Sequence, residues 1–509
     1  MTILLATYFQ EFQLRYGTLR ILLLLFMLTS FVPLYSNSAQ QSSNFFVEGM
    51  AIGLGTNNAN NTATIHPPYT LKPPQTPLDV DDYPVAPEEL ELAQVHVYVR
   101  HGERTPVGVR MSEPPGSIPE NWIMCRDANE FGSAMAANLT SIQSGLDVPK
   151  NARRAVERRD GTSTLGLCLL GQLTDLGRQS TFDYGAALRK LYVERLHFLP
   201  DTLEREEEVY FRSTNVPRTI ESLQQIKHGL YPELKYAAHA APSILIRNGL
   251  DDNLIGNTYA CKRLQILQLG FARAAAAAIN PTLEPLNGKL SKYINGNPVL
   301  LDGQPKASGI LDTIRAATAH GVPVPPEFME DDVMDLLEKS VATEWFEDKT
   351  EEVRRLGMGP LLSDLMKKIQ RKVDPESHDM MKILVHSTHD STLAALLATL
   401  DAYDGRWPPF TSSVTFELFK LREARSRGTM FQNVFSGLWK STPNINDYYI
   451  RARYKNKNLM LPLCADEGKH LSGFPEFCTL SAFQKRVEEL TPRDWESECS
   501  HRGNKTTNR

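Results

Sequence analysis

The stretch Val95–Pro106 constrains the fold of this 509-residue chain more than any other. Three valines alternate with His96 and Tyr98 and predict a short β-strand, which Gly102 and Pro106 bring to an end. The turn that follows reads Arg-His-Gly-Glu-Arg-Thr-Pro, with two arginines around a histidine. Guanidinium groups bind phosphate through paired hydrogen bonds, and an imidazole can act as a nucleophile. The end of this strand is therefore a candidate anion site.

The same order of strand, polar turn and helix occurs again near residue 210. Val209–Phe211 is a predicted strand, and Arg212 opens an Arg-Ser-Thr-Asn turn. Pro217 follows, and proline is typical of the first turn of a helix. Because the two units have the same design, we expect their strands to end at the same edge of one sheet.

A third unit of this kind carries a His-Asp pair. The predicted strand Ile383–Val385 leads to His389 and Asp390, and a helix is expected from Ser391 to Leu400. In open α/β sheets, ligands bind where parallel strands lead into helix N-termini, because the backbone N–H groups there favour anions. Three strand ends would each contribute polar side chains to one site.

The turn Arg-His-Gly-Glu-Arg-Thr-Pro resembles the Arg-His-Gly-x-Arg-x-Pro signature of the histidine acid phosphatases, a branch of the phosphoglycerate-mutase-like superfamily. The Arg-Ser-Thr turn and the His-Asp pair resemble two further landmarks of that family. The C-terminal part, from Leu461 to Cys499, resembles the close of the animal lysosomal and prostatic acid phosphatases. The resemblance extends in patches from about residue 93 to residue 499.

The resemblance implies a role in phosphate-ester hydrolysis for each part of the motif. His101 would attack phosphorus to form a phosphohistidine, and Asp390 would protonate the departing alkoxide and then help to activate water. Four residues would bind the phosphoryl group: Arg100, Arg104, Arg212 and His389. No metal and no cofactor are required. A cationic pocket lowers the pKa of Asp390 whereas burial and bound phosphate raise it, and the sequence leaves open which effect is larger.

An acid phosphatase is the function that the resemblance implies: a phosphoric monoester hydrolase, active in acid, with a small phosphate monoester as substrate. Phytases and lysophosphatidic-acid phosphatases of the same family share these residues and are the alternatives, although His389-Asp390-Ser391-Thr392 is closer to the acid phosphatases. A catalytically silent glycoprotein that binds anions in the pocket is a further alternative. The net charge of −5 gives no reason to expect nucleic acid as a partner.

The family's fold is α/β, with a mixed, mainly parallel central sheet flanked by helices and a smaller inserted, mostly α-helical domain. Helical apolar stripes between about residues 255 and 372 predict that insertion. The catalytic domain would span residues 89–499, with a tail at residues 500–509. Residues 107–170 show no strand pattern and are locally basic, which fits either a solvated loop or a substrate-facing rim.

Local patterns predict three more elements. Thr174 lies in the sequence Gly-Gln-Leu-Thr-Asp-Leu-Gly and is a predicted N-cap of a helix. Val414–Leu421 and Tyr448–Leu463 alternate like two antiparallel strands.

The first 39 residues are expected to be a secretory signal. Arg15 and Arg20 precede the apolar run Ile21–Tyr35, which is shorter than the roughly 20 residues of a spanning helix. A cleaved signal peptide is favoured, and a retained type II membrane anchor is the alternative; a membrane would be a partner only in the second case. Residues 40–88, rich in Pro, Asn and Ser, predict a disordered or extended lead-in. Three Asn-x-Ser/Thr sequences predict glycosylation in the secretory pathway: Asn60, Asn138 and Asn504.

Six cysteines form an even set that fits three disulfides in an oxidising compartment: Cys125, Cys168, Cys261, Cys464, Cys478 and Cys499. None of them has Cys-x-x-Cys spacing, so a structural zinc site is not expected. The family resemblance implies the pairs Cys464–Cys478 and Cys261–Cys499, and it leaves Cys125 with Cys168.

Overall fold

The computed structural model describes residues 78–127, 130–132, 151–422 and 445–500. Contacts divide the chain into two units, Met1–Ile65 and His66–Arg509, and all described residues belong to the second. The expected signal segment, most of the expected lead-in and the three Asn-x-Ser/Thr sites lie outside the described residues. Among the described helices, none is both long and apolar enough to cross a membrane.

Nine strands of the described residues form one mixed sheet. Their bounds are β1 (Leu90–Arg100), β4 (Val209–Ser213), β5 (Ile244–Ile246), β6 (Ile383–Thr388), β7 (Ser413–Leu421), β8 (Tyr448–Tyr454), β9 (Lys457–Leu459), β10 (His470–Leu471) and β11 (Phe474–Thr479). The order is β10-β11-β8-β7-β1-β6-β4-β5, with β9 paired to β8. The pairs β1–β6, β6–β4 and β4–β5 are parallel, and the strands from β7 outward are antiparallel.

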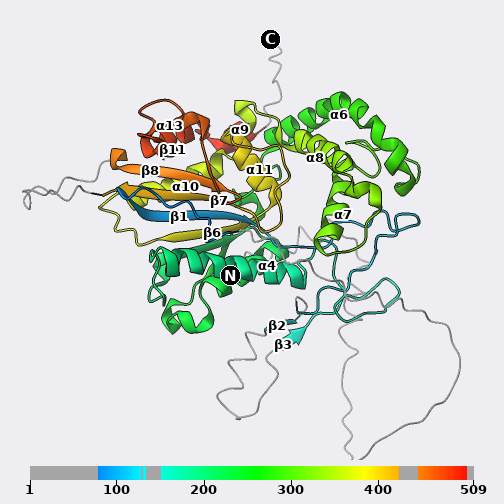
Figure 1. The fold of residues 1–509 in the computed structure, drawn as a ribbon, viewed down its shortest axis with the longest axis horizontal. Helices are drawn as coiled ribbons and strands as arrows, with labels where there is room; N and C mark the ends of the chain where they lie inside the picture. The colour runs from blue at the N-terminus through cyan, green and yellow to red at the C-terminus, as the bar shows by residue number, and fades with distance from the viewer. Residues whose placement is uncertain (1–77, 128–129, 133–150, 423–444, 501–509) are drawn as a thin grey trace, which may run out of the picture. The chain divides into compact units, whose positions relative to one another are not determined.

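Helices cover both faces of this sheet (Figure 1). Their bounds are α4 (Asp175–Arg189), α5 (Pro217–Leu230), α6 (Lys262–Leu290), α7 (Ala307–Ala319), α8 (Asp331–Phe346), α9 (Glu351–Gly357), α10 (Gly359–Val373), α11 (Asp390–Thr399), α13 (Leu480–Leu490) and α14 (Trp495–Cys499). The α/β fold with a mainly parallel centre, predicted from the sequence, is confirmed.

The alternation of β1 explains how the two faces are filled. Val95, Val97 and Val99 point to one side and pack with residues of α4 and α5, whereas Tyr98 points to the other side and packs with α10 and α11. The three valines are fully buried, and each contributes about 1.5–3 kcal/mol to folding through loss of apolar surface from water. The same pattern that predicted the strand therefore places it at the centre of the molecule.

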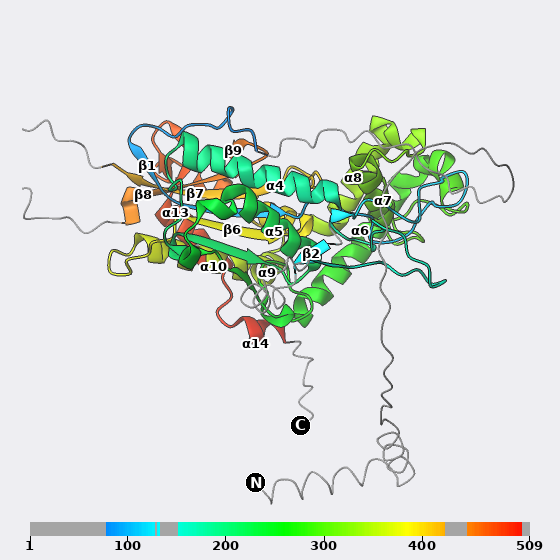
Figure 2. The same ribbon diagram turned by 90° about the horizontal axis from the view of Figure 1, so that it is seen from below.

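The helices α6, α7 and α8 lie beside the sheet and have a core of their own (Figure 2). Leu286, Ile314 and Leu337, one from each helix, are buried in this cluster. Met111 and Trp122, from the loop that follows the signature turn, complete it. The loop and the helices thus form one wall beside the end of β1.

Most predicted elements are present, and three expectations need correction. Tyr448–Leu463 is a hairpin of β8 and β9 rather than one strand, because Lys455 and Asn456 adopt positive φ angles of 49° and 61° and turn the chain. Residues 107–170 contain the short strand pair β2 (Glu130–Gly132) and β3 (Asn151–Arg153).

The third correction concerns the end of the expected lead-in. Residues 78–88 pack on the domain instead of being disordered, and Tyr83 is buried there. Its hydroxyl donates to Glu417 at 3.0 Å and accepts from Arg451 at 2.7 Å. These hydrogen bonds hold the segment on the domain, although its sequence shows only that it is rich in proline.

The six cysteines form the three expected disulfides: Cys125–Cys168, Cys261–Cys499 and Cys464–Cys478. Cys125–Cys168 ties together two parts of the loop beside the signature turn, and Cys261–Cys499 ties the start of α6 to the end of α14. Disulfides are typical of proteins in oxidising compartments.

Candidate active site

The register of β1 and β6 brings two of the predicted motifs together. The strands pair in parallel with Arg100 opposite Thr388, and the backbone N–H of His101 donates to the carbonyl oxygen of Thr388 at 3.0 Å. The next residue of that chain is His389, and the ring centroids of His101 and His389 are 5.7 Å apart. The signature turn and the His-Asp pair therefore meet at one edge of the sheet.

The imidazole of His101 is held in one orientation. Its Nδ1 lies 2.8 Å from the carbonyl oxygen of Gly102, and Nδ1 must carry the proton in this pair because a carbonyl oxygen only accepts. The neutral ring then has its lone pair on Nε2. Burial, together with the positive charges of Arg218 and Arg100, holds the pKa of His101 well below its usual value. This shift favours the neutral ring, which is the form that can act as a nucleophile.

Close backbone packing fixes the turn that carries His101. A Cβ atom at Gly102 would lie 2.3 Å from the carbonyl oxygen of Gly177 in α4, so only glycine fits there. The N–H of Gly102 donates to the hydroxyl of Ser222 in α5 at 3.1 Å. Thr174 caps α4 as predicted and accepts from the N–H of Gly177. Both helices on this face thus hold the turn in place.

Asp390 begins α11, and each of its carboxylate oxygens has a donor. Oδ2 lies 2.7 Å from a guanidinium nitrogen of Arg100 and accepts from the indole Nε1 of Trp407 at 3.0 Å. Oδ1 accepts from the backbone N–H of Ser391 at 2.8 Å. Burial raises the pKa of Asp390, but the charges of Arg100 and Arg104 and the bond from Trp407 outweigh it and lower the pKa to about 2. In the free protein, the positive charges of the pocket therefore have a larger effect on the pKa of Asp390 than burial has.

The segment after α11 supports both Arg100 and Asp390. The carbonyl oxygen of Pro408 accepts from Arg100 at 2.5 Å, and the ring of Phe410 lies 3.9 Å from its Cζ, within the range of a cation–π contact. The backbone N–H of Trp407 donates to the buried Glu338 at 2.7 Å. Since Glu338 lies on α8, the inserted helices position this segment.

Arg104 is held by the insertion as well. Its Nη1 lies 2.8 Å from Oδ1 of Asp312 on α7, and Oδ2 of Asp312 accepts from the N–H of Val107 at 2.9 Å. The Nε atoms of Arg100, Arg104 and Arg218 are buried and have no hydrogen-bond partner. These donors could bind the oxygens of an anion.

His389 stands between β6 and α11, where it is the N-cap residue. Its Nε2 lies 3.0 Å from the hydroxyl of Thr214, which comes from the Arg-Ser-Thr turn after β4. Burial, and then the charge of Arg218, lower the pKa of His389 to about 4. The three strand ends predicted from the sequence therefore do meet. The residue that reaches the site from the end of β4 is Thr214, not Arg212.

Arg212 does not join this group. It lies opposite His386 in the parallel pair, two residues before the end of β6 at Thr388, and it points to the face that α10 covers. One guanidinium nitrogen lies 2.8 Å from Asp252 and the other 3.8 Å from Asp364 of α10. Arg212 thus forms buried ion pairs behind the site, contrary to the sequence-based expectation that it binds the phosphoryl group.

The sequence reasoning missed Arg218, whose charge acts on both histidines of the site. It lies half-buried in the first turn of α5. Of the charged side chains near the site, it has the largest lowering effect on the pKa of His101 and of His389. Burial and the charge of Arg104 lower its pKa to about 10, so it stays cationic in acid. The available signal was its place at a helix N-terminus directly after the strand and turn. Three more residues of the site come from segments that carry no motif: Asp312, Glu338 and Trp407.

Within the part of the chain that the structure describes, no group of three or more His, Cys, Asp or Glu side chains is arranged to hold a metal ion.

Comparison with known proteins identifies the family. The family model of the histidine phosphatase superfamily (branch 2) matches residues 91–455, which include the turn at His101 and the His-Asp pair. The chain belongs to this superfamily. Its members among the acid phosphatases are phosphoric monoester hydrolases, and a phosphohistidine mechanism is general to the family.

Relatives in this superfamily cover most of the chain. A probable acid phosphatase of Schizosaccharomyces pombe is 33% identical over 443 residues, which are 81% of this chain and 95% of that protein. Lysophosphatidic acid phosphatase type 6 of Bos taurus is 29% identical over 350 residues, 67% of this chain and 77% of the relative. Among solved structures, the apo form of Hafnia alvei phytase matches with a TM-score of 0.51 and 14% identity, over 82% of this chain and 100% of that one. The last comparison shows a common fold.

Proposed function

We propose that His101 is the nucleophile and Asp390 the proton donor of this acid phosphatase. Three arginines bind the phosphoryl oxygens: Arg100, Arg104 and Arg218. The observation that carries this proposal is the state of His101, whose Nδ1 is tied to its own turn while burial and arginine charges keep the ring neutral. Nε2 is then the nucleophilic atom, next to three guanidinium groups with unpartnered Nε donors.

In the first step, the lone pair of Nε2 forms an N–P bond as the ester P–O bond breaks. The leaving oxygen takes a proton from Asp390, and the arginines stabilise the charge on the equatorial oxygens. In the second step, water attacks phosphorus, gives a proton to the Asp390 carboxylate and displaces His101. His389, which is hydrogen-bonded to Thr214, lies where it can donate a hydrogen bond to the phosphoryl group.

The free protein and the complex differ in the protonation of Asp390. Its carboxylate pairs with Arg100 in the free site, and this lowers its pKa to about 2. A bound phosphate dianion competes for Arg100 and adds negative charge, and both effects raise the pKa of Asp390. Substrate binding therefore favours the protonated acid that the first step needs, and it does so best at acid pH.

We further propose that the protein enters the secretory pathway and is either secreted or held by its N-terminal segment as a type II membrane protein. The charged and apolar order of residues 1–39, the three disulfides and the acceptor sequences at Asn60, Asn138 and Asn504 support this. Mass spectrometry of the protein purified from its medium would identify a cleaved N-terminus and any glycans.

The test of the proposed function is phosphate release from p-nitrophenyl phosphate in acid, with and without chelator. We expect turnover by the wild-type protein, none by His101→Ala, and no effect of chelator. Acid-quenched protein should carry phosphate on His101 during turnover. Turnover by His101→Ala equal to that of the wild type would overturn the assignment, and phosphate binding without turnover by the wild type would favour the silent anion-binding protein.

A further inference from the structure

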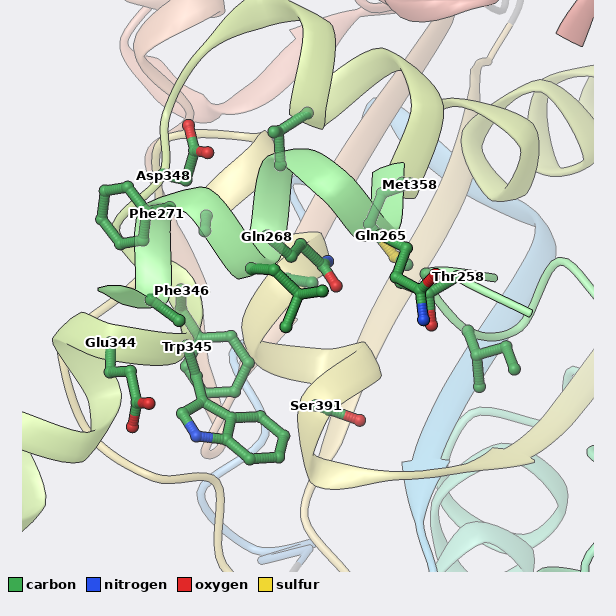
Figure 3. A pocket seen from close by; sticks show the side chains of 18 of the residues that line it. Thr258, Gln265, Gln268, Phe271, Glu344, Trp345, Phe346, Asp348, Met358 and Ser391 are labelled. Atoms are coloured by element: carbon green, nitrogen blue, oxygen red, sulfur yellow. The ribbon is translucent and has the colours of Figure 1, made fainter. Parts of the chain in front are cut away.

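A large cavity runs along α11, and its lining includes Ser391, the residue that follows the proposed proton donor in the chain (Figure 3). Its volume is about 560 Å³, which is in the range of small-molecule binding sites. The floor consists of small residues on one side of α11: Ser391, Ala395, Ala398 and Thr399. This row begins one residue after Asp390 and follows two turns of the helix, and α6, α8 and α9 supply the walls.

The walls are mainly apolar. In Figure 3, Phe271, Trp345 and Phe346 gather on one side of the cavity, while Thr258 and Gln265 lie on the other. Leu269 and Trp345 are among the large apolar side chains that the protein exposes to solvent, at 53% and 50%. Exposed apolar surface gathered in a cavity is typical of a binding site for an apolar group.

Aromatic contacts connect this cavity to the proposed acid. The ring of Trp345 lies 5.6 Å from that of Trp407, and the ring of Phe346 lies 5.3 Å from it. Trp407 in turn donates its indole N–H to Asp390. Because Asp390 protonates the leaving oxygen, the carbon chain attached to that oxygen must begin close to Asp390 and Ser391. The cavity is thus placed to receive the alcohol part of the ester.

The charges of the lining exclude a polyanionic alcohol. Lys306 and Arg354 are the cations of the cavity, and Glu344 and Asp348 are its anions, so the described lining has no net charge. Arg354 is moreover already paired with Asp401 at 2.6 Å. An inositol polyphosphate needs many cations around its ring, whereas an apolar chain needs none.

We propose that this cavity binds the apolar chain of the leaving alcohol, so that the preferred substrates are phosphate monoesters of long-chain, lysophosphatidate-like alcohols. The proposal rests on the proposed function, because it needs Asp390 as the proton donor. An alkyl chain that enters the cavity is removed from contact with water. The free energy gained by burying the chain also stabilises the transition state. The rate of the enzyme therefore depends on the length of the alcohol.

The test uses monophosphates of straight-chain alcohols from butyl to dodecyl, each below its critical micelle concentration, and phytate for comparison. We expect kcat/KM to rise by roughly fourfold for each methylene that enters the cavity. Phytate should be a poorer substrate than dodecyl phosphate. A kcat/KM that is independent of chain length, or that is highest for phytate, would overturn the inference.

A matched pair of variants on α6 locates the effect. Ala272→Trp fills the cavity, and Ala278→Trp places the same side chain on the exposed side of the same helix. We expect Ala272→Trp to remove the dependence on chain length and Ala278→Trp to keep it. Should Ala272→Trp fail to fold, Leu269→Lys puts a charge into the cavity at a half-exposed position and should have the same effect. Retained chain-length dependence in the folded cavity variant would contradict the proposal.

The same series distinguishes the two proposals. If the wild-type protein hydrolyses p-nitrophenyl phosphate through His101 but shows no dependence on chain length, the proposed function stands and the cavity inference fails. If no ester is hydrolysed, the proposed function itself fails.

Discussion

Trp407 donates its indole N–H to Oδ2 of Asp390 at 3.0 Å, the same oxygen that pairs with Arg100. The backbone N–H of Trp407 donates a hydrogen bond to Oε1 of Glu338 on α8, and Arg315 pairs with the same oxygen at 2.7 Å. The proton affinity of the proposed acid is therefore set partly by a helix of the insertion. The position of that helix in the sequence gives no hint of this role.

Trp407→Phe should move the falling limb of the kcat–pH profile to higher pH. The indole bond stabilises the carboxylate form, and its loss raises the pKa of Asp390, so the acid keeps its proton to a higher pH. Trp345→Phe is the control, because Trp345 contacts Trp407 but not Asp390. The profile is measured with p-nitrophenyl phosphate, and an unmoved limb in Trp407→Phe would show that the bond does not tune the acid.

Substitution of Arg218 and Arg212 by methionine should give opposite results. Arg218→Met removes a phosphate donor, and we expect kcat/KM to fall roughly a hundredfold to a thousandfold with the fold retained. Arg212→Met leaves the buried Asp252 without its partner and should cost about 3–5 kcal/mol of unfolding free energy. Urea unfolding and initial rates separate the two effects. A large loss of rate in an Arg212→Met protein that remains stable would show that Arg212 does act in the active site.

Gly102→Ala should destabilise the domain. The added Cβ would meet the carbonyl oxygen of Gly177 at 2.3 Å, and such overpacking typically costs about 1–3 kcal/mol. Gly249→Ala is the matched control, because nothing lies within 4 Å of the added atom there. Urea unfolding midpoints measure the difference, and equal midpoints would mean that the turn can move away from α4.

The buried Glu417 should make stability depend on pH. Burial raises its pKa, but Arg451 and Arg453 outweigh this and lower the pKa below its usual value. A lowered carboxylate pKa stabilises the fold above the unfolded-state pKa of about 4.3, and this contribution is lost as the pH falls through the folded-state pKa.

Glu417→Gln tests this contribution. At pH 7 it leaves the buried charges of Arg451 and Arg453 without their carboxylate partner and should cost about 3–5 kcal/mol of unfolding free energy. The difference from wild type should shrink below about pH 4.3. The exposed Glu488→Gln is the control. Urea unfolding at neutral and acid pH gives the comparison; a difference that does not change with pH would argue against a lowered pKa.

The sequence predicts the parts of the site that depend on backbone pattern. The strand that ends at Arg100, the strand that ends at Thr388 and the helix that begins with Asp390 are periodic and have clear turn signals, so their convergence could be expected. Arg212 shows where that reasoning stops. Periodicity does not tell which of two arginines near a strand end points to the ligand and which points to a covering helix.

Residues that act through long-range contacts could not be predicted. Asp312 lies 208 residues after its partner Arg104, and no local pattern marks it. Trp407 belongs to a loop whose course depends on Glu338. The cavity along α11 likewise depends on how four helices pack, although the small residues that form its floor are visible in the sequence.

The disulfide Cys261–Cys499 spans 238 residues and encloses everything from α6 to α13. Asp390 lies inside this covalent loop and His101 outside it. A protease that cuts the chain once between Cys261 and Asp390 would therefore place the two proposed catalytic residues on different polypeptides that remain one molecule. Such a nicked enzyme would migrate as two fragments only after reduction, and its durability would depend on this bond rather than on an intact backbone.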